Sequence, residues 1–133
     1  MDKPLPIITP DNAPFWEGCR DGRLLLQCCT ACAAWRHPPA PVCPRCASTG
    51  AAWTPTAHAG RVYSFVIYRR AFHPAHAAEV PYAVALVELD EGVRLPLRVV
   101  DCPPEALRIG ARGEIRFARP TDGVTVPVFA PLP

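Results

Sequence analysis

Long apolar segments are missing from this sequence. No part of it approaches the roughly 20 consecutive apolar residues that a membrane-spanning helix needs. Residues 1–14 also lack the basic segment followed by an apolar segment that marks a secretory signal peptide. We therefore expect a cytoplasmic protein without membrane segments. Thiols stay reduced in that compartment, so metal binding explains closely spaced cysteines better than disulfides do.

Clustered positive charge is also missing. The net charge is +2, and the longest basic run is Arg69-Arg70. Proteins that bind nucleic acids usually gather Lys and Arg on one face, because the phosphate backbone dominates their affinity. We therefore do not expect DNA or RNA as the main partner. The alternative is an OB-fold nucleic-acid-binding module in which the strand aromatics Tyr63, Phe65 and Tyr68 stack on bases. Tyr63 and Phe65 share one face of the predicted strand, and Tyr68 points the other way.

Catalytic sequence motifs are absent as well. The histidines are His37, His58, His73 and His76. None of them accompanies a Ser–His–Asp order, a nucleophile elbow, a phosphate-binding glycine loop or an HExxH motif. Cys19 and Cys102 stand alone, and a lone cysteine is usually a small buried hydrophobe. We therefore expect no catalytic residue in this chain.

The most specific feature that is present is a pair of CxxC motifs. Cys29 and Cys32 form the first motif, and Cys43 and Cys46 form the second after ten intervening residues. Two such turns can deliver four thiolates tetrahedrally to one zinc ion, which prefers soft sulfur ligands. Four protein ligands leave no open position, so we expect a structural zinc; iron bound as in rubredoxin is the alternative. Cys28 is not expected to be a ligand, since only Cys29 gives the two-residue gap.

Residues 12–22 predict a short helix before the cysteines. Asn12 is its expected N-cap, Pro14 suits the first turn, and Gly22 is a typical stop signal. The apolar face of this helix consists of Phe15, Trp16 and Cys19. This face either packs on its own domain or, through Phe15 and Trp16, contacts another subunit.

Short β-rich runs separated by turn residues follow from residue 60 onward. Strands are predicted at 61–69, 82–89, 93–100, 112–118 and 124–129. Gly92 and Asp122-Gly123 mark hairpin turns, and residues 103–107 suit one helical turn between the third and fourth strands. This order predicts a mainly β protein with a five-stranded OB-fold barrel. Another small Greek-key barrel and a split sheet are the alternatives.

These elements divide the chain into three expected parts. They are an extended N-terminus with a short helix at 1–22, a rubredoxin-like zinc ribbon at 23–54, and the OB-fold at 55–133. The loop between the first two barrel strands is one that OB-folds use for ligands. Its cations, aromatic ring and imidazoles are expected to contact a partner enzyme or its substrate channel, the alternative being an ordinary exposed loop. These residues are Arg69, Arg70, Phe72, His73 and His76.

The order and spacing of these motifs resemble the zinc-ribbon plus OB-fold proteins that accompany thiolases, a family long catalogued as a domain of unknown function. The likeness covers about residues 12–131 and is carried by Phe15-Trp16-Glu17-Gly18, Gly22-Arg23-Leu24, the CxxC motifs with Pro38-Pro39 between them, Gly60-Arg61-Val62-Tyr63-Ser64, Val80-Pro81-Tyr82, residues 87–94 and Pro127-Val128-Phe129. The resemblance implies a non-catalytic accessory subunit of a thiolase-like, acyltransferase or aldolase complex that acts on acyl-CoA or related acyl substrates. Such a subunit would stabilise the catalytic subunit and help to form its substrate channel. A stand-alone acyl-CoA-binding protein is the alternative.

The sequence departs from the family pattern at three positions. Ala33 and Ala47 stand where the family often has glycine after each CxxC motif. If the turns keep a positive φ, each alanine costs roughly 1 kcal/mol. Ala40 follows the paired prolines, where the family often has arginine, and Arg36 or Arg45 would have to substitute for it. This departure weakens the transfer of a CoA-binding role to the ribbon.

Overall fold

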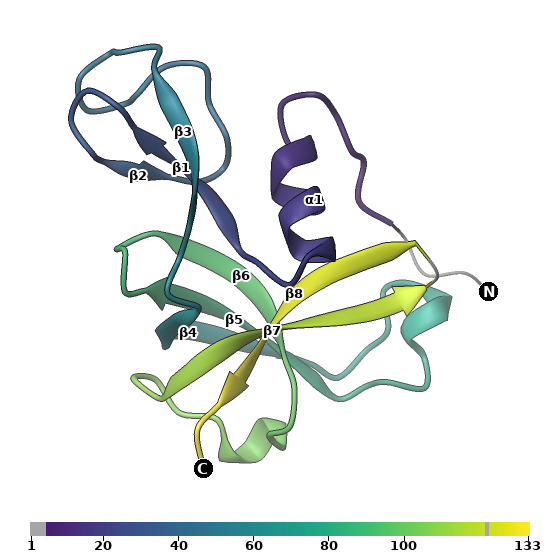
Figure 1. Ribbon diagram of the computed structural model, residues 1–133. Coiled ribbons are helices and arrows are strands. Elements are labelled where there is room, and N and C mark those ends of the chain that lie inside the picture. The colour runs from purple at the N-terminus through teal and green to yellow at the C-terminus, as the bar shows by residue number, and fades with distance from the viewer. Residues whose placement is uncertain (1–4, 122) are drawn as a thin grey trace.

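The computed structural model describes residues 5–121 and 123–133. A single α-helix and a small three-stranded sheet precede a closed five-stranded barrel (Figure 1). The small sheet stands away from the barrel, and the helix lies beside it against the barrel end (Figure 1). The elements before the barrel are α1 (Ala13–Arg20), β1 (Leu25–Cys29), β2 (Trp35–Arg36) and β3 (Ala51–Pro55).

The helix α1 stops just before Gly22, the residue that the sequence predicts as its stop signal. The N–H of Gly22 donates to the carbonyl of Cys19 (3.0 Å), and the N–H of Arg23 donates to that of Gly18 (2.8 Å). This pair of bonds is a Schellman motif, which requires the positive φ of +75° that Gly22 adopts. The start differs in detail, because the Asn12 side chain does not cap the helix. Its Oδ1 instead accepts from the N–H of Thr9 (2.7 Å).

The barrel follows the OB-fold strand order and confirms the predicted fold class. Its strands are β4 (Ala59–Tyr68), β5 (Tyr82–Leu89), β6 (Arg94–Val99), β7 (Arg112–Thr121) and β8 (Val124–Pro131). They close in the order β4-β5-β6-β8-β7, with β6 and β8 parallel and β7 returning to β4. Two 3₁₀ turns, Pro74–His76 and Pro104–Ala106, connect β4 to β5 and β6 to β7. The second is the helical turn that the sequence predicts.

The fourth barrel strand is longer than the sequence predicts. It was expected to end at residue 118, but β7 continues to Thr121. The register with β8 shifts between Ala118 and Thr121. A proline within a sheet is tolerated at such an irregularity because no ladder hydrogen bond is lost there. Pro120 therefore does not stop the strand. The turn residue Asp122 lies outside the described residues, whereas Gly123 has the expected positive φ of +80°.

One hydrophobic core joins the helix, the base of the ribbon and the barrel. Alternate residues of β5 face inward, and Phe129 of β8 is fully buried among them. Phe15, Cys19 and Leu24 belong to the same buried cluster. The apolar face of α1 therefore packs on its own domain. No helix in the described part of the chain is long and apolar enough to span a membrane.

His58 ties the ribbon to the barrel. Its Nε2 accepts from the N–H of Leu24 (3.0 Å), next to a backbone bond from Thr56 N–H to the Leu24 carbonyl (3.0 Å). The His58 ring also meets the edge of Phe117, with centroids 5.6 Å apart. These contacts give His58 a structural role where β1 starts and the chain passes into β4.

Candidate metal centre and contact surfaces

The structure brings four cysteines of the CxxC motifs together. The Sγ atoms of Cys29, Cys32, Cys43 and Cys46 all lie within 4.8 Å of one another. Two of the separations are 3.6 Å (Cys29 to Cys46) and 3.7 Å (Cys32 to Cys43). A tetrahedral zinc ion with Zn–S bonds of about 2.3 Å separates its sulfurs by about 3.8 Å. The donor set and its spacing therefore fit one zinc ion, held in a closed shell without a position for substrate.

The backbone of each turn prepares its first cysteine for the metal. The N–H groups of Cys32 and Ala31 lower the pKa of Cys29 to about 6. The N–H groups of Cys46 and Arg45 likewise lower the pKa of Cys43. Hydrogen bonds to a thiolate favour the charged form, which is the form that binds zinc. The turns therefore favour metal-competent sulfurs at these two positions.

Alanines close both turns with positive backbone angles. Ala33 has φ of 64° and Ala47 has φ of 63°. Their N–H groups donate to the carbonyls of Cys29 and Cys43, each at 2.9 Å. The departure from glycine thus leaves the turn conformation unchanged, and the strain falls on the alanine Cβ atoms.

The remaining cysteines lie apart from the metal centre. The Sγ of Cys28 contacts the carbonyl of Ala33 (3.4 Å) and does not join the four-sulfur cluster. Cys19 is fully buried in the core, and burial raises the pKa of its thiol to about 12. Both findings agree with the roles expected from sequence, since a protonated buried thiol is a poor nucleophile.

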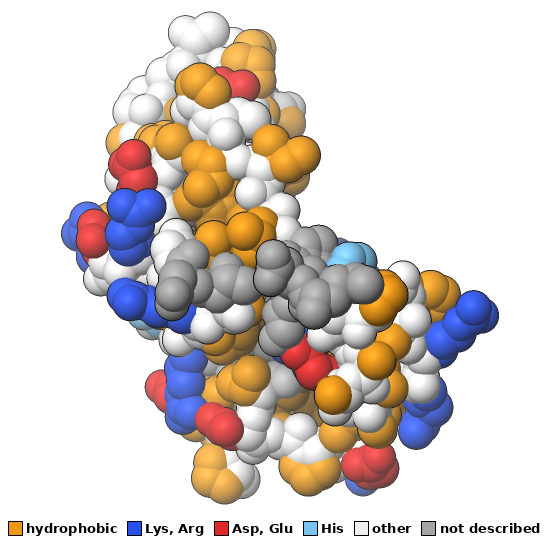
Figure 2. Space-filling model, turned by 90° about the vertical axis from the view of Figure 1, so that its right-hand side faces the viewer, with side chains coloured by type: hydrophobic (Ala, Val, Ile, Leu, Met, Phe, Trp, Pro, Cys, Tyr) orange, Lys and Arg blue, Asp and Glu red, His pale blue; other side chains and the backbone are white. Residues whose placement is uncertain are grey.

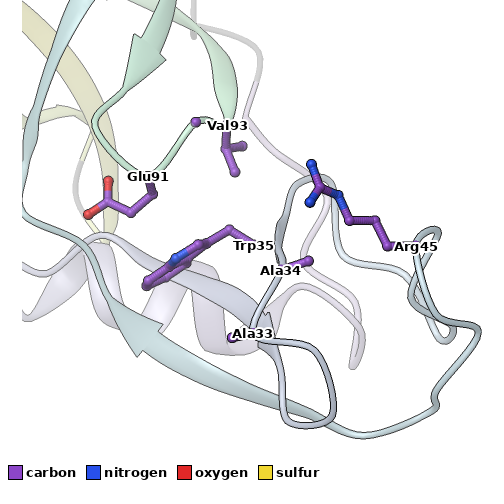
Figure 3. Close-up of a pocket in the computed structure, with 7 residues that line it drawn as sticks. Ala33, Ala34, Trp35, Arg45, Glu91 and Val93 are labelled. Carbon is purple, nitrogen blue, oxygen red and sulfur yellow. The ribbon is translucent and has the colours of Figure 1, made fainter.

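A small pocket separates the ribbon from the barrel (Figure 3). It measures about 250 Å³, with Trp35 and Arg45 on the ribbon side and Glu91 and Val93 on the barrel side. Glu91 Oε2 accepts from the N–H of Ala57 (2.8 Å), while no described residue bonds to its buried Oε1. This carboxylate anchors the hairpin and has no nucleophile or base beside it in the pocket lining.

The two arginines considered as substitutes for a family arginine have different environments. Arg36 is 6% exposed, and its Nε donates to Gln27 Oε1 (2.8 Å) while its Nη2 donates to the Ala40 carbonyl (2.9 Å). It therefore holds the loop around Ala40 and presents no charge to the surface. Arg45 is exposed at the rim of the pocket (Figure 3).

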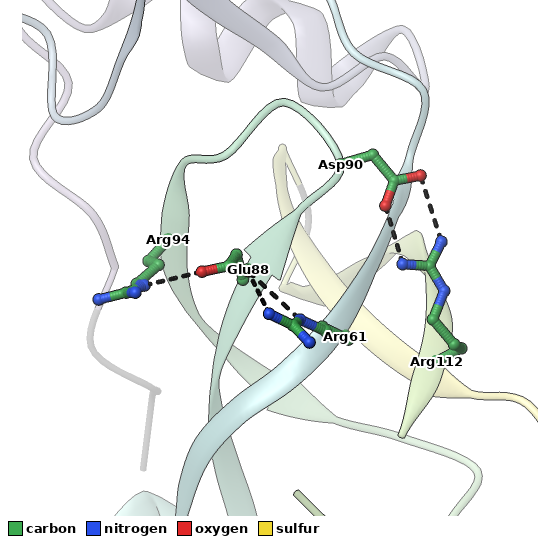
Figure 4. A network of polar contacts seen from close by, with 5 residues as sticks. All are labelled: Arg61, Glu88, Asp90, Arg94 and Arg112. Carbon is green, nitrogen blue, oxygen red and sulfur yellow. Dashed lines mark hydrogen bonds and ion pairs between the residues drawn. The ribbon is translucent and has the colours of Figure 1, made fainter. Parts of the chain in front are cut away.

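Two acidic residues of the barrel hairpin, Glu88 and Asp90, are paired with arginines (Figure 4). Glu88 lies between Arg61 of β4 (2.9 Å) and Arg94 of β6 (3.1 Å). Asp90 forms a two-pronged pair with Arg112 (2.9 and 3.2 Å). Hydrogen bonds from the arginines hold the pKa values of Glu88 and Asp90 below their usual values. These carboxylates stay ionised at neutral pH and are not candidates for general acid catalysis.

An apolar groove lies where helix, ribbon and barrel meet. Its volume is about 400 Å³, and it is lined by Asn12, Phe15, Trp16, His37, Pro38, Pro39, Leu95, Pro96, Leu97, Val126 and Pro127. Phe15 is only 6% exposed, so most of its ring serves the core. No described residue bonds to the buried Nε1 of Trp16. A partner contact through Trp16 and the exposed edge of Phe15 stays a prediction.

The loop between β4 and β5 presents the other predicted contact residues. Phe72 is 77% exposed, and Arg70 lies over its ring with Cζ 5.7 Å from the centroid. His73 and His76 have local roles: Nδ1 of His73 accepts from the N–H of Ala75 (3.1 Å), and Nδ1 of His76 lies 3.0 Å from Glu79. The imidazoles thus shape the 3₁₀ turn, and the partner contact expected of the five residues remains a prediction.

Sequence reasoning did not bring together three residues beside this loop: Tyr68, which it considered only for base stacking, and Tyr82 and Arg98, to which it gave no contact role. The rings of Tyr68 and Tyr82 are stacked with centroids 5.1 Å apart, and the Cζ of Arg98 lies 3.8 Å from the Tyr82 centroid. Tyr68 and Tyr82 are direct partners in the β4–β5 ladder. Pairing the predicted strands 61–69 and 82–89 as a hairpin could have placed Tyr68 opposite Tyr82.

The fold and metal centre define a class of protein: a zinc ribbon joined to an OB-fold barrel. Two family descriptions match the chain, "ChsH2, rubredoxin-like zinc ribbon domain" over residues 16–51 and "ChsH2, C-terminal OB-fold domain" over residues 53–118. The chain belongs to this family of ChsH2-type proteins, also known as DUF35 proteins. The resemblance found from the sequence motifs is therefore confirmed.

The relatives that match this zinc ribbon and OB-fold are proteins of different kinds. The "Probable enoyl-CoA hydratase alpha subunit" of Thermomonospora curvata is 42% identical over 97% of this chain. This chain spans only 40% of that relative's length. A "DUF35 domain-containing scaffold protein" of Methanocaldococcus jannaschii is 32% identical over 68% of this chain and 64% of its own. In the solved "Ltp2-ChsH2(DUF35) aldolase", one chain is 40% identical with a TM-score of 0.88, covering 95% of this chain and 98% of that one.

Proposed function

We propose that this chain is a non-catalytic accessory subunit of a thiolase-like enzyme complex. The complex would carry out acyl transfer, or carbon–carbon bond formation or cleavage, on acyl-CoA or related acyl substrates. This chain would stabilise the catalytic subunit and help to form its substrate channel. A cytoplasmic location is part of the proposal, because the metal centre needs reduced thiols.

The observation that carries the proposal is likeness over nearly the full length to a chain of the Ltp2-ChsH2(DUF35) aldolase, at 40% identity and a TM-score of 0.88. The contacts of the candidate reactive groups among the described residues also support the proposal. The zinc ligands form a closed shell, and the barrel carboxylates Glu88 and Asp90 are paired with arginines. In this proposal the reacting groups come from another subunit.

The shape of the chain also suits an accessory role. The ribbon projects from the barrel, and α1 fills the space beside it (Figure 1). Zinc fixes the ribbon, and the shared core fixes the helix. Both elements thus present rigid side chains to a second protein, which lowers the entropic cost of association.

Co-purification from the source organism tests this proposal. A tagged chain should recover a thiolase-like subunit in a fixed ratio, identified by mass spectrometry. The purified catalytic subunit should lose stability or turnover when this chain is withheld and regain it when zinc-loaded chain is added. Recovery of the tagged chain alone, with its zinc, would contradict the proposal.

A further inference from the structure

A continuous stack of aromatic rings and guanidinium groups lies at the end of the barrel that carries the β4–β5 loop. We name it the arginine–tyrosine stack; it consists of Arg70, Phe72, Tyr68, Tyr82 and Arg98. The Cζ of Arg98 lies over the Tyr82 ring, 3.8 Å from its centroid. The Tyr68 ring also stacks on the Tyr82 ring, with the two centroids 5.1 Å apart. Phe72 meets Tyr68 edge to face at 6.1 Å, and Arg70 lies beyond Phe72.

The stack is fixed by the strands beneath it. Tyr68 and Tyr82 are paired across β4 and β5, and Arg98 stands on the next strand, β6. Glu79 holds Arg98 at 2.7 Å and also accepts contact from His76 at 3.0 Å. The stack is therefore already in place before any ligand arrives, apart from the exposed ring of Phe72 at its outer end.

A cavity of about 530 Å³ adjoins the stack. Arg98, His76 and Glu79 border it on one side and Arg119 of β7 on another, over a floor of valines from β6 and β8. Figure 2 shows apolar and basic side chains next to each other on one face of the molecule. The surface thus combines an aromatic projection, an apolar hollow and positive charge.

Positive charge at this surface is not balanced locally. Among the described residues, Arg69, Arg70 and Arg119 have no carboxylate within ion-pair distance. The acids at the cavity are already paired, Glu79 with Arg98 and Asp101 with Arg116. A surface that fits here must supply carboxylates for the three arginines and an apolar recess for Phe72.

We propose that the arginine–tyrosine stack is the docking site for the catalytic subunit, and that the matching surface is an apolar pocket rimmed by Asp and Glu. This proposal rests on the proposed function and names the face that serves it. Tyr and Arg beside an exposed aromatic ring are the residue types that dominate binding energy at protein interfaces. A nucleic acid fits less well, because the chain carries a net charge of only +2 and its longest basic run is Arg69-Arg70.

Cross-linking in the source organism provides the first test. The photoreactive residue p-benzoylphenylalanine replaces Phe72 in one variant and Ile109 in a control, since Ile109 is similarly exposed at 70% but follows the other 3₁₀ turn. Position 72 should cross-link to the catalytic subunit, at a peptide flanked by Asp or Glu. Cross-links to nucleic acid, or to the catalytic subunit from position 109 and not from 72, overturn the proposal.

Affinity measurements with the co-purified catalytic subunit provide the second test. The variants Phe72→Ala and Arg69→Glu/Arg70→Glu should each weaken binding by about tenfold or more, and the charge reversal should also reduce its salt dependence. The control Arg108→Glu should bind within about twofold of the unaltered chain.

Unchanged binding in the first two variants overturns the docking face and leaves the proposed function standing. Failure of the unaltered chain to recover any catalytic subunit removes both. Reduced turnover with unchanged assembly assigns the face to substrate and also overturns docking.

Discussion

The Sγ atoms of Cys29 and Cys46 lie 3.6 Å apart, although 17 positions separate these residues in the chain. A metal-binding arrangement explains why two thiols from separate turns meet at that distance with two more beside them. The neighbouring Cys28 has its sulfur outside this group. Adjacent cysteines thus have different predicted roles, which substitution can separate.

Substitution of Cys29 should abolish metal binding, whereas substitution of Cys28 should preserve it. Cys29→Ser removes one of four ligands, and zinc sites of this kind contribute about 10–16 kcal/mol of apparent binding energy in small domains. The melting temperature of the Cys29→Ser variant should fall sharply, because the ribbon shares a core with the barrel. Metal analysis of the purified chain should find one zinc in the Cys28→Ser variant. Iron in place of zinc, or retention of metal by Cys29→Ser, would contradict the assignment.

Glycine at the two strained turns should stabilise the chain. Ala33→Gly and Ala47→Gly remove the Cβ from backbone with φ near 64° and 63°, so each should raise the free energy of unfolding by about 1 kcal/mol. Denaturant unfolding of the zinc-loaded chain measures this gain. Ala34 is the matched control, since it adjoins the same turn but is not among the positive-φ residues. Ala34→Gly should lower stability by about 0.5–1 kcal/mol, and a gain there would contradict the strain argument.

The pH dependence of stability should depend in part on His37. Burial lowers the pKa of His37 below its usual 6.5, so the unfolded chain takes up a proton more readily than the folded chain does. The neutral ring therefore favours folding above pH 6.5, and this contribution is lost as the pH falls through the folded-state pKa. His37→Phe keeps the ring contact with Phe15 but cannot titrate.

Thermal unfolding of both proteins at pH values from about 7.5 to 5.5 tests this prediction, because the range spans the ordinary histidine value. The unaltered chain should lose more stability on acidification than His37→Phe does. Proton release from the zinc ligands affects both proteins equally, so the difference between them isolates His37. Parallel pH profiles would show that the His37 proton affinity is the same in the folded and unfolded states.

A methyl group at Gly113 should disturb the barrel core. A Cβ at this position would lie 2.5 Å from the Phe129 ring and 2.5 Å from the carbonyl of Ala130. Gly113→Ala should therefore lower the free energy of unfolding by about 1–3 kcal/mol, the usual cost of overpacking. Adding Phe129→Leu should recover only part of that loss, because the backbone carbonyl of Ala130 remains in place. Full recovery would show that the ring alone opposes the methyl group.

The sequence predicted correctly the features that depend only on residues close together in the chain. The CxxC motifs position their own cysteines, and Gly22 and Gly92 end their elements through positive φ. Features that depend on tertiary context were missed. Asn12 bonds to Thr9 instead of capping α1, and β7 continues through Pro120 at an irregularity in its pairing with β8. The stacking of Arg98 on Tyr82 needs the register of β5 and β6, which no single segment specifies.

The closed strand order of the barrel limits how it can meet other proteins. Each of the five strands has a neighbour on both sides, from β4 through β5, β6 and β8 to β7 and back to β4. The two closing pairs are short, covering three positions between β4 and β7 and two between β6 and β8, but they leave no strand with a wholly unpaired side, which limits edge-to-edge aggregation. We therefore expect recognition by the barrel to run mainly through side chains and loops. A change of partner during evolution would require a few surface substitutions while the backbone stayed as it is.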